Sequence, residues 1–129
     1  MKFKRYCKTL QLYNDPVLIE RYIKAHAKDQ VWPEIEQGMN EVGILDMEIY
    51  IHGTTLFMIM DTVPDFDHDR AFKELAKKPK QKEWEVLMAQ FQKTPEGASA
   101  DEKWQLMERI YELGQKEEFK AIHGQKKEC

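Results

Sequence analysis

Cysteine is scarce in this sequence: the 129 residues contain two, Cys7 and Cys129, at opposite ends of the chain. Neither belongs to a CxxC pair, so the sequence suggests neither a disulfide framework nor a zinc site. No apolar run approaches the roughly 20 residues needed to cross a membrane. The first residues, MKFKRYCKTLQLYND, lack the apolar core of a secretory signal. We therefore expect a cytoplasmic protein without a membrane-spanning segment.

An excess of basic charge is also missing, because 23 acidic residues outnumber 20 Lys and Arg residues and give a net charge of −3. No stripe of Lys and Arg alternates with aromatic residues, which argues against nucleic acid as a partner. What the chain does have is 42% hydrophobic and 33% charged residues, a composition typical of a globular protein with a well-charged surface. Its length suits one domain with one core.

Short apolar patterns divide the chain into strands and helices. Strands are predicted at Phe3–Leu12, Ile44–His52, Leu56–Thr62 and Trp104–Leu113, and helices at about 17–27, 33–42, 70–77 and 81–92. The strand Leu56–Thr62 (LFMIMDT) is expected to be buried on both faces. The charged stretch 114–129 is predicted to be a tail that follows a folded domain of residues 1–113.

Capping residues support three of these boundaries. Asp15, which precedes Pro16, can accept hydrogen bonds from the free N–H groups of a helix start, and Asp67 or Asp69 can do so for a later helix. Gly43 stands where a helix commonly ends in a left-handed residue.

The predicted segments follow the order strand, helix, strand, strand, helix, strand. This order predicts an α+β fold of the ferredoxin-like βαββαβ kind, with an antiparallel sheet and helices on one face. The other face is then bare, and it is expected to carry Glu48, Tyr50, Met107 and Tyr111. Because a symmetric dimer is the usual way to cover such a face, we expect a homodimer.

Tyr22 and His26 are the first candidate site residues. They lie four residues apart in the segment RYIKAHAKDQVWPEIE (Arg21–Glu36), a spacing that places both side chains on one helix face. The ordinary pKa of histidine, about 6.5, suits proton transfer near neutral pH. On spacing alone, burial of both residues under a sheet is the more common situation. Trp32 is expected to pack at the helix break before Pro33.

A metal site is not predicted. His52, His68, Asp67 and Asp69 offer ligand atoms, but they are spread over a strand end and a loop, and this gives no ligand spacing.

At Tyr22, His26, Trp32–Glu34 and Glu48–Ile51, the chain resembles the L-rhamnose mutarotase family. The resemblance runs from about Tyr6 to Leu113. It implies a dimeric α/β-barrel built from ferredoxin-like subunits, and an isomerase that interconverts the α and β anomers of L-rhamnose. Anomer exchange needs two proton movements but no metal, redox group or covalent nucleophile, so no cofactor is expected.

The same resemblance implies roles for four residues. His26 is similar to the family's catalytic proton donor, and Tyr22 and Tyr50 are similar to its sugar-binding tyrosines. Trp84 is similar to one of two adjacent tryptophans that line the sugar site, but Glu83 precedes it here. Because this chain departs from the family at that position, L-fucose, another 6-deoxy-L-hexose, is a competing substrate.

Two other functions stay open on these observations, because a shared fold does not determine function. A dimeric α/β-barrel monooxygenase of the haem-degrading or quinol-forming kind would bind haem or take up oxygen. A non-catalytic ligand-binding or dimerisation module would bind a sugar while its anomer exchange stayed at the solvent rate.

Overall fold

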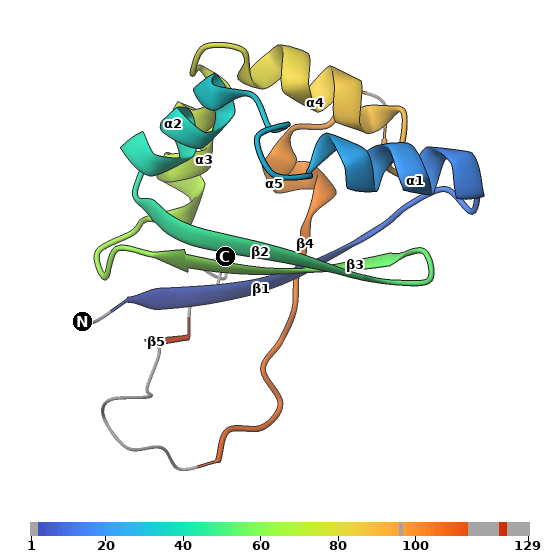
Figure 1. Cartoon of the computed structure of the whole chain (residues 1–129). Helices are drawn as coiled ribbons and strands as arrows, with labels where there is room; N and C mark the ends of the chain where they lie inside the picture. Colours follow the sequence, from blue (N-terminus) through green and yellow to red (C-terminus); the bar gives the residue numbers. More distant parts are fainter. Residues whose placement is uncertain (1–2, 96, 114–121, 124–129) are drawn as a thin grey trace.

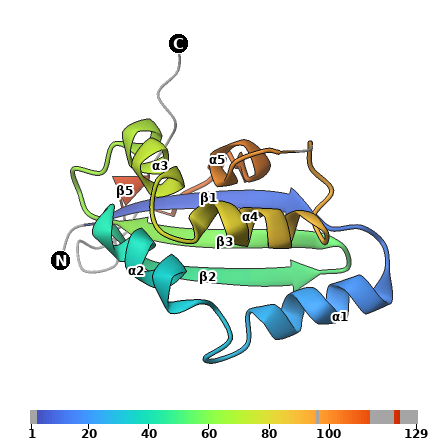
Figure 2. The same cartoon turned by 90° about the horizontal axis from the view of Figure 1, so that it is seen from above.

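The computed structural model describes residues 3–95, 97–113 and 122–123, which form one sheet beneath a layer of helices (Figure 1). The strands are β1 (Lys4–Gln11), β2 (Ile44–His52), β3 (Thr55–Thr62), β4 (Gln105–Leu106) and β5 (Ile122–His123). The helices are α1 (Pro16–Ala25), α2 (Pro33–Glu41), α3 (His68–Ala76), α4 (Gln81–Ala89) and α5 (Ala100–Lys103). Figure 2, seen from above, shows the helices spread over one face of the sheet. The predicted α+β fold is confirmed.

The sheet has the strand order β2-β3-β1-β4. Neighbouring strands along this path are antiparallel, and β5 pairs in parallel with Lys4 and Arg5 of β1. The helices α1 and α2 connect β1 to β2, and α3 to α5 connect β3 to β4. This is the predicted ferredoxin-like pattern, with each helix of the simple scheme divided into shorter pieces.

The last strand is much shorter than predicted. Of the segment Trp104–Leu113, only Gln105 and Leu106 form a ladder with β1, which the Met107 N–H extends with a 2.7 Å bond to the Cys7 carbonyl oxygen. Further along this edge, β5 already pairs with β1 at Lys4–Arg5. After β4 the chain leaves the sheet (Figure 1), and residues 107–113 belong to no strand. The prediction that Tyr111 lies on the bare sheet face is therefore wrong.

The tail is described only in part. Residues 122–123 form β5, whereas the rest of the predicted tail lies outside the described residues. The boundary at residue 113 stays a prediction.

The strand β3 is buried on one face, not on both. Leu56, Met58, Met60 and Thr62 are buried, and the residues between them are partly exposed. The prediction was wrong because the helices cover a single face of the sheet, so alternate side chains of a central strand stay uncovered.

A register shift at the start of β2 changes which side chain enters the core. The sequence pattern assigned Leu45 to the core, but Leu45 is 43% exposed and Ile44 is 3% exposed. The shift lies between Ile44 and Asp46, where β2 has one more residue than β3. The extra residue, Leu45, interrupts the alternation of the two sheet faces, so the side chains after it point to the opposite faces from those that Ile44 alone would predict. Met47 and Ile49 then face the helices as predicted.

The predicted caps are confirmed. Asp15 Oδ1 accepts hydrogen bonds from the N–H groups of Val17 and Leu18, and Asp67 Oδ1 accepts one from Arg70 N–H. Gly43 has a φ of +105°, a left-handed value that side chains rarely adopt. None of the helices in the described ranges is long and apolar enough to cross a membrane.

Candidate active site

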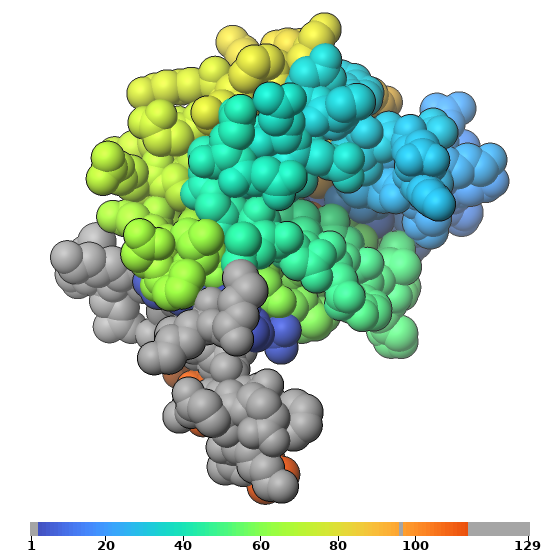
Figure 3. Space-filling model, turned by 60° about the vertical axis from the view of Figure 1, so that its left-hand side comes forward, coloured from blue at the N-terminus to red at the C-terminus, as the bar shows by residue number. Residues whose placement is uncertain are grey.

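A cavity of about 330 Å³ lies between the helices and the sheet. Its floor includes the sheet side chains Met47, Ile49 and Met58. Its walls carry polar and aromatic side chains from α1, α4 and the residues that follow these helices, among them Tyr22, His26, Trp84, Glu85 and Gln92. Figure 3 shows a hollow on this side of the molecule between α1 (blue), α2 (teal) and β2 (green). The volume lies at the lower end of the roughly 300–1,000 Å³ typical of small-molecule sites.

His26 stands at the C-terminal end of α1, with one ring nitrogen already engaged. Its Nδ1 lies 2.8 Å from the carbonyl oxygen of Tyr22. A carbonyl can only accept, so Nδ1 carries the hydrogen, and in the neutral ring Nε2 is left with a free lone pair. Burial lowers the pKa of His26 below the ordinary 6.5, although the hydrogen bond to the Tyr22 backbone opposes this shift. At neutral pH the ring is therefore suited to accept a proton at Nε2.

Tyr22 lies directly against His26, as its spacing predicted. The ring centroids are 4.4 Å apart, and the tyrosine is buried. Burial raises the pKa of Tyr22 to about 12, so the phenol keeps its proton at neutral pH. Gln92 Nε2 donates to the phenol oxygen over 3.5 Å, which leaves the phenol's own hydrogen free to be donated.

Trp84 lines the same cavity, and a second tryptophan accompanies it. The Trp84 ring lies 5.7 Å from His26 and 5.2 Å from Trp32, in both cases edge to face. Trp32 comes from the break between α1 and α2, whereas the residue before Trp84, Glu83, is exposed. The aromatic pair is therefore assembled from two segments distant in sequence, which no local motif reveals.

Tyr50 is the one candidate residue that the structure does not bring to the cavity. It lies on the uncovered face of β2, is 54% exposed, and donates from its hydroxyl to Glu48 Oε1 over 2.9 Å. Its neighbours in the strand, Met47 and Ile49, line the cavity from the opposite face. Because the sheet separates Tyr50 from His26, a sugar beside His26 cannot touch Tyr50 of the same subunit.

The wall formed by α4 also contains a charged group that the sequence analysis missed. Glu85 Oε1 accepts from Lys103 Nζ over 2.9 Å, and its Oε2 accepts from Gln81 Nε2 over 2.8 Å. Lys103 Nζ also donates to the backbone carbonyl of Glu85 over 2.8 Å. Gln81 and Glu85 are four residues apart, so their contact on one helix face can be predicted from the sequence. The pairing of Glu85 with Lys103 depends instead on how α5 packs on α4.

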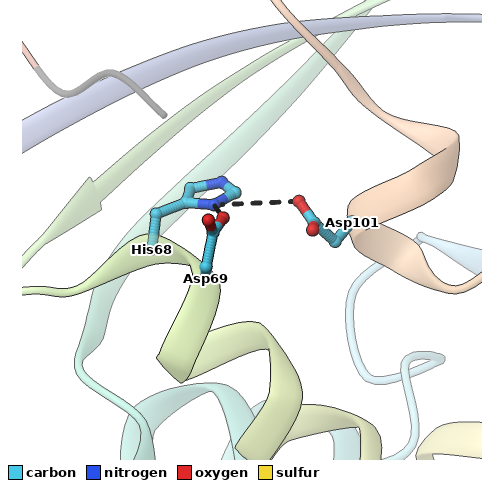
Figure 4. A group of neighbouring side chains, drawn as sticks. All are labelled: His68, Asp69 and Asp101. Atoms are coloured by element: carbon cyan, nitrogen blue, oxygen red, sulfur yellow. Dashed lines mark hydrogen bonds and ion pairs between the residues drawn. The ribbon is translucent and has the colours of Figure 1, made fainter. Parts of the chain in front are cut away.

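A second cluster lies away from this cavity, at the start of α3. His68 Nδ1 is 3.3 Å from Asp69 Oδ1 and 3.7 Å from Asp101 Oδ1, the latter in α5 (Figure 4). Asp101 is distant from His68 and Asp69 in the sequence, and only the packing of α5 against α3 brings it close to them. One imidazole and two carboxylates within 4.8 Å of one another are a donor set that divalent cations can use. The same three groups also link α3 to α5, and none of them lines the His26 cavity.

Comparison with known proteins shows the family of the chain. The family model described as L-rhamnose mutarotase matches residues 5–113. The chain belongs to the L-rhamnose mutarotase family. The predicted class of enzyme, an isomerase that exchanges sugar anomers, is thereby confirmed.

Two relatives and one solved structure are similar over most of their length. An L-fucose mutarotase of Xanthomonas campestris pv. campestris is 35% identical over 115 residues, which are 89% of this chain and 92% of the relative. A UPF0734 protein of Dictyostelium discoideum is 37% identical over 116 residues, which are 86% of this chain and 90% of that protein. The crystal structure of an L-rhamnose mutarotase from Formosa agariphila superposes with a TM-score of 0.64 at 21% identity, covering 85% of this chain and 98% of that one. At this identity the structure supports the shared fold alone.

Proposed function

We propose that the chain interconverts the α and β anomers of a 6-deoxy-L-hexose, L-rhamnose or L-fucose, in the cavity beside His26. The observation that carries the proposal is the pairing of a free imidazole Nε2 with a protonated phenol in one cavity of sugar size. L-Rhamnose is the sugar in the family's name, and L-fucose is the sugar in the name of the Xanthomonas relative.

The proposed mechanism starts with the proton-free imidazole. His26 Nε2 takes the proton of the anomeric hydroxyl while the Tyr22 hydroxyl protonates the ring oxygen, and the C1–O5 bond opens to an aldehyde. Rotation about C1–C2 presents the other carbonyl face. Ring closure reverses both transfers, so the imidazolium of His26 then acts as the proton donor that the family resemblance implies. A positioned acid/base pair of this kind contributes about 10²–10⁴-fold in rate.

The apolar side of the sugar has a matching surface in the cavity. A 6-deoxy sugar carries a methyl group on C5, and the cavity offers the Trp84 ring on its wall and the thioethers of Met47 and Met58 on its floor. Met107, which the sequence pattern assigned to the bare sheet face, does not line the cavity. The polar groups of α1 and α4 remain for the hydroxyl groups, an arrangement typical of small-molecule sites.

We also propose that the protein is a cytoplasmic homodimer whose subunits meet through the uncovered sheet face. That face carries the exposed ring of Tyr50, 6.4 Å from Phe57, and, further along β3, the Arg5–Asp61 ion pair. A second copy is the occupant expected of such a face, because a symmetric interface pairs the same patch on both subunits. In this arrangement Tyr50 contributes to the dimer interface and not to the sugar site. Light scattering of the wild type should give twice the 15.4 kDa chain mass, and Phe57→Lys should give the monomer mass.

The activity is tested by measuring anomer exchange with NMR saturation transfer. L-Rhamnose and L-fucose are the test sugars, and D-glucose, with a hydroxyl on C6, is the control. We expect exchange of at least one 6-deoxy-L-sugar well above the buffer rate, and little enhancement for glucose. If none of the sugars exchanges faster than in buffer, the proposed activity is wrong, and haem binding measured by absorbance becomes the next test.

A further inference from the structure

We infer that the Glu85 carboxylate binds hydroxyl groups of the sugar held beside His26 and Trp84, an inference that rests on the proposed function. Anomer exchange requires groups at C1 and O5 alone, so nothing in the reaction itself demands a carboxylate in this cavity. Glu85 therefore needs a different explanation from His26 and Tyr22.

The position of Glu85 on α4 places it next to the aromatic wall. Gln81, Trp84, Glu85 and Met88 recur at helical spacing, and all four line the cavity. A sugar ring lying beside Trp84 would present its hydroxyl edge to the neighbouring Glu85. The methionine side chains of the sheet offer no comparable hydrogen-bond acceptor.

The Glu85 carboxylate is held in place before any sugar arrives. Lys103, whose side chain is 1% exposed, lies 2.9 Å from Oε1, and buried Gln81 donates to Oε2 over 2.8 Å. Each carboxylate oxygen has two lone-pair sites, so one site on each oxygen remains unused by these two bonds. The Glu85 side chain is 17% exposed, in contrast to Lys103, so part of it stays accessible.

These features suit recognition of two neighbouring hydroxyl groups. Hydrogen bonds from a hydroxyl to a carboxylate are charge-assisted and stronger than those between neutral groups. Two adjacent hydroxyls can reach both oxygens of one carboxylate. Glu85 would then fix the orientation of the ring, with C1 and O5 directed towards His26 and Tyr22.

The test is Glu85→Gln, a change of nearly equal shape that removes the charge. We expect KM for the active sugar to rise about tenfold, because losing a hydrogen bond to a charged group weakens binding by about this factor or more. The value of kcat should stay within a few-fold, since the bond forms equally in ground state and transition state. The matched control is Glu83→Gln, an exposed position on the same helix, which should leave both constants unchanged.

A purely structural role for Glu85 predicts a different result. If the Glu85–Lys103 pair only ties α5 to α4, Glu85→Gln lowers the melting temperature and leaves KM at the wild-type value, and the inference is then wrong. Because Glu85→Gln leaves a buried ammonium without its partner, a double variant, Glu85→Gln with Lys103→Met, removes both charges. We expect this variant to show the same increase in KM, and a wild-type KM in a folded double variant would overturn the inference.

Deoxy analogues of the active sugar give a second readout that folding does not affect. The analogue that lacks the hydroxyl bound by Glu85 should bind the wild type more weakly than the full sugar does. Glu85→Gln, in contrast, should bind the analogue and the full sugar with about the same affinity. Equal losses in both proteins, for every hydroxyl tested, would refute the assignment. Since these comparisons need an active wild type, an inactive wild type rejects the proposed function instead, so the two failures are distinguishable.

Discussion

Replacing His26 with glutamine removes the group that the mechanism uses to move a proton, while keeping a side chain of similar length. The hydrogen-bond geometry defines what is lost. In the wild type Nδ1 is committed to the Tyr22 carbonyl over 2.8 Å, so Nε2 is the nitrogen available to the sugar. A glutamine side chain can still donate to that carbonyl, but it cannot accept and return a proton near neutral pH.

The expected loss is the contribution of a positioned acid/base group. At about 10²–10⁴-fold, it corresponds to about 2.7–5.4 kcal/mol of activation free energy, because each tenfold change in rate is 1.36 kcal/mol. Exchange in His26→Gln should therefore approach the buffer rate. The fold should persist, since His26 lies at the end of α1 and its backbone N–H bonds to Ile23 and Lys24 do not involve the side chain.

The pH profile of the wild type gives an independent check on the same residue. Burial lowers the pKa of His26, so the proton-free form prevails above a value that lies below 6.5. The activity should fall as the pH drops through that value, with the midpoint on the acid side of 6.5. As the pH falls, His26 of the unfolded chain takes up a proton before His26 of the folded chain does. The stability that comes from a neutral His26 is therefore fully present above pH 6.5, about the unfolded pKa, and is lost as the pH falls from 6.5 through the folded pKa.

The assay is NMR saturation transfer on the active sugar from pH 5 to pH 8, with denaturant unfolding of the wild type and His26→Gln at the same pH values. The variant should lose less stability than the wild type between pH 6.5 and the folded pKa. A variant that keeps more than about a tenth of wild-type exchange would refute the catalytic role of His26. An acid limb with its midpoint above 6.5 would refute the effect of burial on its pKa.

Two further predictions concern the tyrosines and the core. Tyr22→Phe should slow anomer exchange at least tenfold because it removes a buried donor in the cavity, whereas Tyr50→Phe, measured in the same assay, should leave kcat unchanged because Tyr50 lies on the opposite sheet face. Met60→Ala should lower the free energy of unfolding by about 2–5 kcal/mol because Met60 is fully buried. Urea denaturation measures this loss, and Val86→Ala, at a 67% exposed position, should stay within about 0.5 kcal/mol.

Local patterns were enough to predict most of the secondary structure. Hydrophobic periodicity and the caps at Asp15 and Asp67 depend on residues a few positions apart, and the corresponding helix starts were confirmed. The pairing of Tyr22 with His26 is local in the same way, because both lie on one helix face. The length of β4 and the burial of β3 were predicted wrongly. The first depends on how far the strand pairs with β1, and the second on which sheet face the helices cover.

The sequence by itself determined the order of the elements, the helix face shared by Tyr22 and His26, and the family to which the chain belongs. Only the tertiary structure decided which other side chains join them. Trp32 meets Trp84, and Lys103 meets Glu85, through helix packing between segments far apart in the chain. Tyr50 lies outside the cavity beside His26, because successive side chains of a strand point to opposite faces of the sheet. The helices lie on one of those faces, which forms the cavity floor, and Tyr50 points to the other.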